Sequence, residues 1–319
     1  MQRRSENSDT TPEPQGESAR EPDVNTAAEL VDAARMSAAQ RTAETTGTTD
    51  EPTPEEGEVL PVGMAYPVTR HAHFSEPGEW KFLSCGVDTL DLGLHVEWGD
   101  RFDDLTVRLD ELRKVATGTS GVCWGDRDIL VHGSGKPPMY RWHLQWPEFH
   151  CWIGISREPK GGTPNVYVSI NAETIWRLGV PVAETLVRET IDGLGGRVRQ
   201  VIPSRCDIAA DFLIPGGLEL EFLQALQVPR NRQVSHVGKP DSLETYYVGA
   251  KVSPIQLRIY DKAKEVQKEG TKLWFLDIWR VDSCVDVWRV EFQLRRAFLS
   301  EQNINTVDDL LKKIGDLWD

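Results

Sequence analysis

The stretch from Glu244 to Lys262, ETYYVGAKVSPIQLRIYDK, predicts two β-strands joined by a tight connection. Side chains alternate between the two faces of a strand, so parity assigns each residue to a face. Tyr246 falls on a mostly apolar face of the first strand, and Tyr247 falls on the opposite face. We therefore expect Tyr246 to point into a core and Tyr247 to lie on a polar surface.

The second predicted strand brings cations to that surface. Arg258, Tyr260 and Lys262 share one of its faces. Two neighbouring strands can thus offer phenols and cations together. Such a surface suits a phosphodiester, because a phenol can attack phosphorus while Lys and Arg hold the charge. Tyrosine is also a good strand former. On this pattern alone, the surface could equally be an ordinary solvated sheet face without a catalytic role.

Composition separates the first sixty residues from the rest. Residues 1–60 contain no aromatic residue and hold 5 Lys and Arg against 14 Asp and Glu, a net charge of −9 of the chain's −14. Such a segment buries too little apolar surface to offset its ordering entropy, so we expect a disordered acidic tail. Residues 61–319 form the expected folded domain. Its last helix, from Thr306, reaches the end of the chain at Asp319, which favours a domain that is incomplete at its C-terminus.

Missing motifs exclude several classes of protein. The five cysteines stand far apart without a C-x-x-C pair, which argues against a zinc ribbon or a disulfide framework. The chain shows neither a signal peptide nor an apolar run of about 20 residues, so we expect a cytoplasmic protein without a membrane partner. His71 and His73 are the only close histidine pair and lie in an expected loop, so no zinc site is predicted. Gly133 to Lys136 lacks the spacing of a Walker A loop, which excludes ATP binding by that route.

Hydrophobic periodicity predicts an α+β fold. In the segment 86–98, Leu90, Leu92 and Leu94 share one face of a half-buried strand. An Asp-bearing strand, a helix and further strands occur at 86–170 and again at 204–296. We therefore expect a largely antiparallel sheet built from two similar halves, a pseudo-repeat, with helices packed on it. The other expected elements are strands at 128–132, 140–146, 149–156, 165–170, 204–212, 230–236 and 286–296, and helices at 103–116, 171–178, 181–193, 218–227 and from 306.

Acidic residues on two predicted strands form a candidate metal site. Asp207 and Asp211 share one face of the strand at 204–212 and lie ~7 Å apart along it, too far for simple bidentate chelation. Glu291, on the polar face of the strand at 286–296, could supply a third oxygen ligand. Such a set suits Mg²⁺ or Mn²⁺. A network of Asp–Arg and Glu–Arg ion pairs is the alternative, and spacing alone favours it.

Three segments in this order resemble the trans-acting replication initiation factor family: SRCDIAADF (204–212), ETYYVGAKVSPIQLRIYDKAKE (244–265) and VWRVEFQLRR (287–296). Members include rolling-circle plasmid replication initiators and relaxases of integrative conjugative elements. With GVDTLDLGLHVEW (86–98) and NVYVSINAETIWRLG (165–179), the resemblance covers roughly residues 80–317. It implies a metal-dependent endonuclease and strand transferase. A tyrosine would attack one phosphodiester at an origin, leaving a 5′-phosphotyrosyl link and a free 3′-OH.

The resemblance also implies roles for particular residues. Tyr247, two places before the glycine of the Y-x-G segment, would be the nucleophile, with Tyr246 the second choice and Tyr260 the third. The Mg²⁺ or Mn²⁺ ligands would come from Asp207, Asp211 and Glu291, with Asp88 or Asp91 as a contributor from the first half. The contacts to the scissile phosphate or flanking backbone would come from Lys251, Arg258, Lys262 and Arg289. Many members have Ser-Arg after the glycine, where this chain has Ala250 and Lys251, so the cation is kept but its bidentate geometry is lost.

Origin DNA, single-stranded or extruded, is the implied partner, with a homodimer and a host helicase as further expectations. Two other functions stay open at this stage. One is a non-catalytic origin-binding regulator derived from such an initiator, which the acidic composition favours. The other is an α+β binding protein without a DNA role. The motifs do not separate replication from conjugation, which differ in genetic context.

Overall fold

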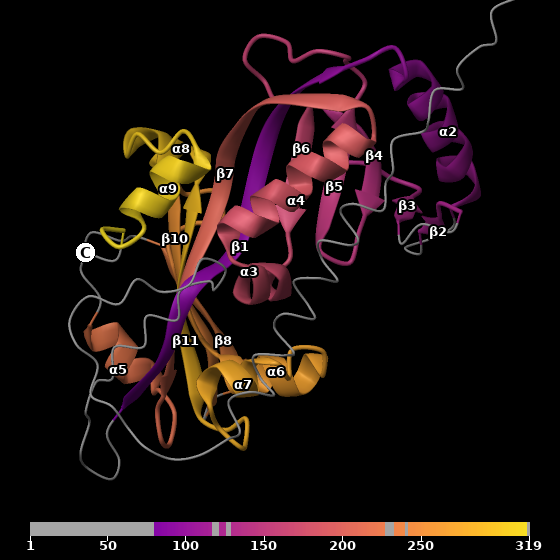
Figure 1. The fold of residues 1–319 in the computed structure, drawn as a ribbon. Coiled ribbons are helices and arrows are strands. Elements are labelled where there is room, and N and C mark those ends of the chain that lie inside the picture. The colour runs from indigo at the N-terminus through magenta and orange to yellow at the C-terminus, as the bar shows by residue number, and fades with distance from the viewer. Residues whose placement is uncertain (1–79, 117–120, 126–128, 227–232, 240–241, 318–319) are drawn as a thin grey trace, which may run out of the picture.

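The computed structural model describes residues 80–116, 121–125, 129–226, 233–239 and 242–317. The strands of this part form one eleven-stranded antiparallel sheet with helices packed on it (Figure 1). The predicted α+β class is therefore confirmed. The expected tail at 1–60 and the pair His71 and His73 lie outside the described residues. No helix in the described ranges is long and apolar enough to cross a membrane.

The first half of the chain begins with a long strand and ends with two helices. Its elements are β1 (Lys81–Trp98), α2 (Phe102–Val115), β2 (Val122–Cys123), β3 (Leu130–His132), β4 (Tyr140–Gln145), β5 (Phe149–Gly154), β6 (Val166–Ile170), α3 (Ala172–Leu178) and α4 (Val180–Gly193). The apolar face predicted for β1 is confirmed, because Leu90, Leu92 and Leu94 have no exposed surface, but the strand is not half-buried there, since Asp91 on the opposite face is 6 % exposed. They pack with Leu109 of α2 and Val187 of α4 in the largest core.

The second half also begins with a long strand and ends with two helices. Its elements are β7 (Gly196–Leu213), α5 (Leu220–Ala225), β8 (Val234–Lys239), β9 (Ser242–Val248), β10 (Ile255–Asp261), α6 (Lys262–Glu269), α7 (Phe275–Trp279), β11 (Val287–Arg295), α8 (Arg296–Glu301) and α9 (Val307–Lys313). The Thr306 side chain caps α9 through a capping box with Asp309, which agrees with the helix start predicted there. The sequence did not predict α6, α7 or α8.

The order of the strands repeats between the halves. It runs β2-β3-β4-β5-β6-β1-β7-β11-β10-β9-β8, so each long strand pairs with the last strand of its own half. The two long strands pair with each other along their whole length, from Lys81 opposite Leu213 to Trp98 opposite Gly196. Figure 1 shows β1 and β7 running through the middle of the molecule, with α2 near one end, α5 to α7 near the other and α3 between them beside β1. The halves are thus related by a pseudo-two-fold axis between β1 and β7.

Bulges in β1 and β7 show which residue of one long strand corresponds to which residue of the other. In the β1–β7 pairing, Leu83 and Asp88 of β1 and Arg199 and Ser204 of β7 stand unpaired at shifts of register. The differences 199 − 83 and 204 − 88 both equal 116, so each β1 position corresponds to the β7 position 116 residues later. The same offset relates Asp91 to Asp207. The pseudo-repeat expected from the two Asp-bearing strands is therefore present in the sheet itself.

One face of the sheet, here called the polar face, carries His143, Asp207, Arg258, Glu291 and Tyr247. The opposite face supplies the core residues that pack on α2, α4, α5 and α9. Helices α3, α6 and α7 cover one end of the polar face, where Trp176, Phe275 and Trp279 pack in one cluster with Leu83 and Val287.

Candidate active site on the polar face of the second half

A row of directly paired residues brings a phenol, a guanidinium and a carboxylate together. Tyr247 on β9 pairs with Arg258 on β10, Arg258 pairs with Glu291 on β11, and Glu291 pairs with Ala209 on β7. Directly paired residues of antiparallel strands point to the same face, with Cβ atoms about 5 Å apart. The small Ala209 lies between Asp207 and Asp211 on β7, as the spacing predicted. The strands therefore place Tyr247 on the polar face with Arg258 and Glu291.

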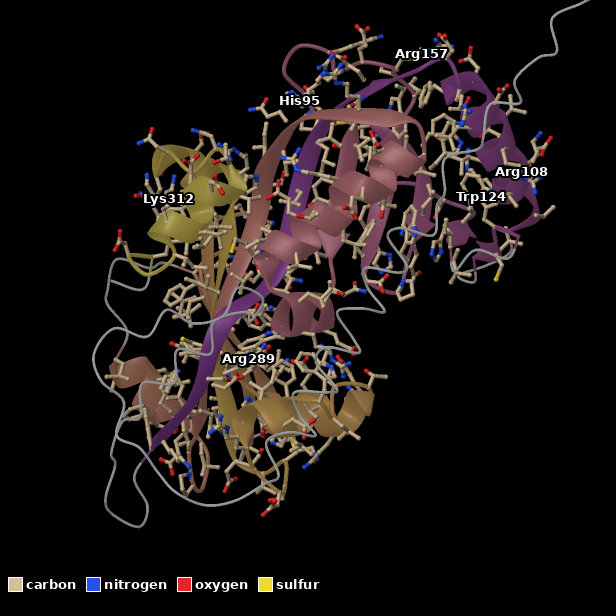
Figure 2. The ribbon with its side chains drawn as sticks, viewed as in Figure 1. His95, Arg108, Trp124, Arg157, Arg289 and Lys312 are labelled. Carbon is tan, nitrogen blue, oxygen red and sulfur yellow. The ribbon has the colours of Figure 1, made fainter. Side chains whose placement is uncertain are left out.

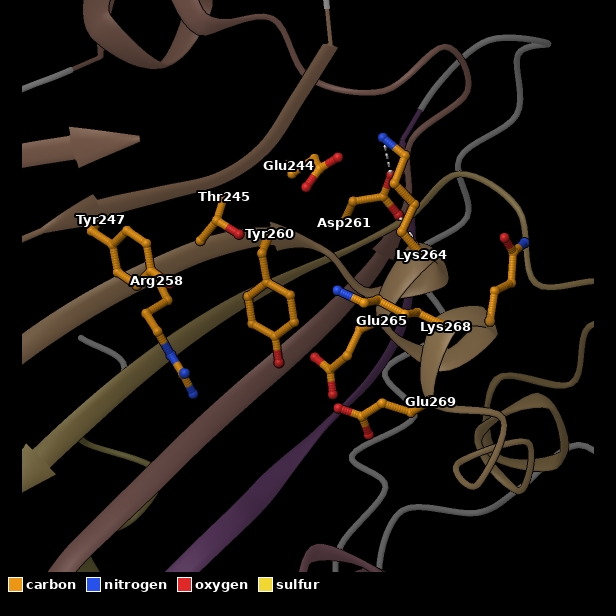
Figure 3. A pocket seen from close by; sticks show the side chains of 11 residues that line it. Glu244, Thr245, Tyr247, Arg258, Tyr260, Asp261, Lys264, Glu265, Lys268 and Glu269 are labelled. Carbon is orange, nitrogen blue, oxygen red and sulfur yellow. Dashed lines mark hydrogen bonds and ion pairs between the residues drawn. The ribbon is translucent and has the colours of Figure 1, made fainter. Parts of the chain in front are cut away.

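A groove opens beside Tyr247 and Arg258. It has a volume of about 790 Å³ and is lined by β9, β10 and α6, through Glu244, Thr245, Tyr247, Arg258, Tyr260, Asp261, Lys264, Glu265, Gln267, Lys268 and Glu269. Figure 3 shows Tyr247 and Arg258 at one end of this groove and the charged side chains of α6 at the other. The groove offers both signs of charge, because four of its lining residues are acidic and three are basic.

The three candidate tyrosines differ sharply in environment. Tyr246 is 2 % exposed and packs with Leu243 and Trp288 in the core under α5, which agrees with the parity prediction. The Tyr260 hydroxyl donates a hydrogen bond to Glu291 Oε2 at 3.0 Å, and burial raises the pKa of Tyr260 well above 10. Tyr247 is half-buried at the groove, and within the described part of the chain its hydroxyl makes no hydrogen bond. Tyr247 is thus the tyrosine of the three best placed to react.

Two buried carboxylates converge on Arg258. Its Nη2 donates to Glu291 Oε1 and lies 3.9 Å from Asp207 Oδ2. Asp207 also accepts from Arg205 Nε at 2.8 Å and from Gln293 Nε2 at 3.4 Å. Burial raises the pKa of Asp207 to about 6, although Arg205 acts in the opposite direction. Arg258 is about one-third exposed, whereas both carboxylates have no exposed surface.

The other two predicted acidic ligands bind a buried arginine. Asp211 accepts from Arg289 Nε at 2.6 Å and Nη2 at 2.8 Å, and its Oδ2 also accepts from Trp279 Nε1 at 2.8 Å and Ser84 Oγ at 3.1 Å. Asp88 accepts from Arg289 Nη1 and, at 3.1 Å, from Trp176 Nε1. Figure 2 shows Arg289 in the middle of the molecule.

This second cluster links β1, β7 and β11 to α3 and α7. Both oxygens of Asp211 and Oδ1 of Asp88 accept hydrogen bonds from protein donors, so the two carboxylates are engaged by Arg289 and its neighbours. The ion-pair network that the spacing favoured is what the structure shows at these two residues. Asp91, the other suggested contributor, accepts from the Tyr167 hydroxyl at 2.7 Å.

The four cations predicted to contact phosphate also separate into two groups. Lys251 is exposed in the β9–β10 connection, and Arg258 reaches the groove. Lys262 is 1 % exposed and Arg289 is 0 % exposed, which does not support a phosphate contact for either. The strand prediction extended too far at Lys262, because Asp261 accepts a hydrogen bond from the Lys264 backbone and caps α6 there.

The groove has two cations that the sequence reading missed, Lys264 and Lys268. They lie four residues apart, the spacing that places side chains on one face of a helix. The signal in the sequence is an aspartate at the N-cap position, Asp261, followed by lysines at helical spacing.

Asp207 and Glu291 are the acidic pair nearest the Tyr247–Arg258 pair, and an ion bound there would replace protein donors: Arg205 and Gln293 donate to Asp207, and Arg258 and Tyr260 donate to Glu291. They are oxygen ligands on adjacent strands, and a positive group, the Arg258 guanidinium, already lies between them. With two protein ligands, such a site would take its remaining ligands from water and substrate phosphate, as Mg²⁺ commonly does.

No protein-family model and no curated protein matches this chain. A solved structure described as a rolling circle replication initiator protein from Geobacillus stearothermophilus is similar at 20 % identity, with a TM-score of 0.38. The similarity covers 71 % of this chain and 79 % of that chain.

Proposed function

We propose that this protein nicks one DNA strand at an origin and transfers it through a 5′-phosphotyrosyl link at Tyr247. The observation that carries the proposal is the paired row Tyr247–Arg258–Glu291 beside Asp207, at an open groove. The resemblance of the three ordered sequence segments to trans-acting replication initiation factors supports it independently of the geometry. The product initiates rolling-circle replication or conjugative transfer.

In the proposed reaction the Tyr247 oxygen attacks phosphorus. An oxygen–phosphorus bond forms to Tyr247 and the phenol proton is lost to solvent. The bond from phosphorus to the 3′ oxygen breaks, and that oxygen takes a proton from solvent to become the free 3′-OH. Arg258 contacts the phosphate oxygens and stabilises the charge that develops on them. The phosphodiester energy is kept in the covalent link, so a later 3′-OH can reverse the step without ATP.

Asp207 and Glu291 would hold Mg²⁺ or Mn²⁺ in this proposal. When bound, such an ion would offset the negative charge that develops on the phosphate oxygens. With such an ion on the carboxylates, the Arg258 guanidinium would be available to contact the phosphate oxygens. Lys251, Lys264 and Lys268 would contact the flanking DNA backbone, which must be single-stranded or extruded to reach the groove.

Incubation with Mn²⁺ and a supercoiled plasmid that carries the cognate origin tests the proposal. We expect nicking and a covalent protein–DNA adduct on a denaturing gel, and no adduct with Tyr247→Phe. Tyr246→Phe is the matched control, since its ring lies in the core one residue away and the adduct should persist. Normal nicking by Tyr247→Phe would show that another group is the nucleophile.

A non-catalytic origin-binding regulator is the second candidate. Its specific support is that Asp88, Asp207, Asp211 and Glu291 are each paired with an arginine, an arrangement that is complete without a metal ion. Origin binding by the unmodified chain in a gel-shift experiment, without nicking at any Mg²⁺ or Mn²⁺ concentration, would favour this candidate. Loss of nicking with retained binding in Glu291→Gln would favour the enzyme.

A further inference from the structure

Three histidines from three different strands lie close together on the polar face of the first half. His132, His143 and His150 lie on β3, β4 and β5, and one ring nitrogen from each lies within 4.8 Å of the others. Among the described residues, this is the group of three His, Cys, Asp or Glu side chains whose ligand atoms lie close enough together to bind one ion. The three side chains are half-buried, so a small ion can reach them from solvent.

The rings are already held in position by their neighbours. His143 stacks on His132 with centroids 4.1 Å apart and on Trp152 with centroids 4.5 Å apart. His132 Nε2 lies 2.8 Å from Gln145 Oε1, which fixes the orientation of that imidazole. A ligand set that is oriented before binding loses little conformational entropy when the ion arrives.

The nitrogen spacing matches shared coordination. His143 Nε2 and His150 Nδ1 lie 2.9 Å apart. Two nitrogens bound to one tetrahedral Zn²⁺ at about 2.0–2.1 Å stand roughly 3.3 Å apart, so a small rotation of either ring accommodates an ion in place of the shared proton.

We propose that His132, His143 and His150 bind a divalent ion of the zinc class. Imidazole nitrogens suit Zn²⁺, Cu²⁺ and Ni²⁺, whereas Mg²⁺ and Mn²⁺ prefer oxygen ligands. Three protein ligands leave a fourth position open to water or a further group. The ion ties together three short strands at the β2–β5 side of the sheet.

This ion is separate from the one proposed to serve Tyr247. Between β4 and β9 lie seven inter-strand steps, and at about 4.8 Å each they place the histidines on the order of 30 Å from Tyr247. The pseudo-two-fold axis relates the two places, because β3, β4 and β5 correspond to β8, β9 and β10. The corresponding rows of paired residues are His132–His143–Trp152–Tyr167–Gly93 and Ser235–Tyr247–Arg258–Glu291–Ala209. The two halves therefore carry different chemistry at equivalent positions.

Zinc binding by the tag-free full chain tests the proposal directly. After removal of metals with a chelator, the protein is mixed with Zn²⁺, separated by gel filtration and analysed for metal content. We expect one Zn²⁺ per chain at micromolar concentration, and a visible absorption spectrum of tetrahedral type when Co²⁺ replaces Zn²⁺. His143→Ala and His150→Gln should each lower the zinc content at least tenfold, and His150→Gln keeps a side chain of similar reach if the loss of the stacked ring in His143→Ala impairs folding.

His236→Ala is the matched control, because His236 is exposed on β8 in the other half. It should retain the full zinc content. A chain that holds no Zn²⁺ at micromolar concentration, or His143→Ala and His150→Gln proteins that still hold one Zn²⁺, would overturn the proposal. Neither result depends on whether the protein nicks DNA, because the readout is metal content.

Discussion

Arg289 shows how a residue's surroundings decide its role. Its side chain has no exposed surface, lies 4.7 Å from the centre of the Phe275 ring and binds both Asp211 and Asp88. Burial acts to raise the pKa of Asp88, but Arg289 and Lys262 outweigh it and hold that pKa well below its ordinary value. A residue that resembles a phosphate ligand in sequence is thus committed to two internal carboxylates.

Replacement of Arg289 by Leu should strongly destabilise the protein, since it leaves two buried carboxylates without their cation. We expect the free energy of unfolding to fall by about 3–5 kcal/mol, measured by urea denaturation. Arg108→Leu is the control, because the Arg108–Glu111 pair at 3.1 Å is more than half exposed on α2 and should contribute less than about 1 kcal/mol. Similar losses in the two variants would contradict a central role for Arg289.

At the scale of elements, the β9–β10 connection and α6 decide the shape of the candidate site. The connection returns the chain so that Tyr247 pairs with Arg258, and α6 then forms the other side of the groove. Gly249, which follows β9, has φ +94°, and an added Cβ would lie 3.0 Å from the Ile255 carbonyl oxygen. Gly270, which ends α6, has φ +66°, and an added Cβ would contact nothing within 4 Å.

This pair of glycines separates backbone strain from steric contact. Gly270→Ala should lower the free energy of unfolding by about 1 kcal/mol through the left-handed backbone alone. Gly249→Ala should lower it by roughly 2–3 kcal/mol, because the φ angle is less favourable and the new methyl group meets a carbonyl oxygen. Urea denaturation of the two variants under one set of conditions checks the difference. Equal losses would mean that the connection relaxes around the added methyl group.

At the scale of the whole molecule, one pair of strands supports both halves. β1 and β7 each have 18 residues and contribute to the polar face and to the main core of both halves. Leu92 of β1 and Ile208 of β7 are related by the 116-residue offset and are both buried. Because the sheet is continuous, a destabilising substitution at either position should lower the stability of both halves.

Leu92→Ala and Ile208→Ala should each lower the free energy of unfolding by about 2–5 kcal/mol. Amide hydrogen exchange followed by mass spectrometry should become faster in β5 and in β10 with either variant. Val107→Ala, at a 60 % exposed position of α2, should leave exchange in both strands unchanged. Faster exchange confined to the half that carries the substitution would show that the two halves open independently.

Local patterns in the sequence determined much of this fold. The alternation of Leu90, Leu92 and Leu94 predicts which face of β1 is buried, and the opposite parity of Tyr246 and Tyr247 predicts which tyrosine reaches the groove. Both follow from the two-residue repeat of a strand, which needs no knowledge of its neighbours. The same reasoning places Asp207 and Glu291 on polar faces of their strands.

Contacts between distant segments decided the rest. Which carboxylates lie beside Tyr247 depends on the register of β7, β11, β10 and β9, and the burial of Lys262 and Arg289 depends on how α6 and α7 pack on the sheet. His132, His143 and His150 have no metal-ligand spacing in the sequence, and only the pairing of β3, β4 and β5 brings their rings together. A strand's own residues establish its faces, whereas its neighbours are chosen by packing over the whole chain.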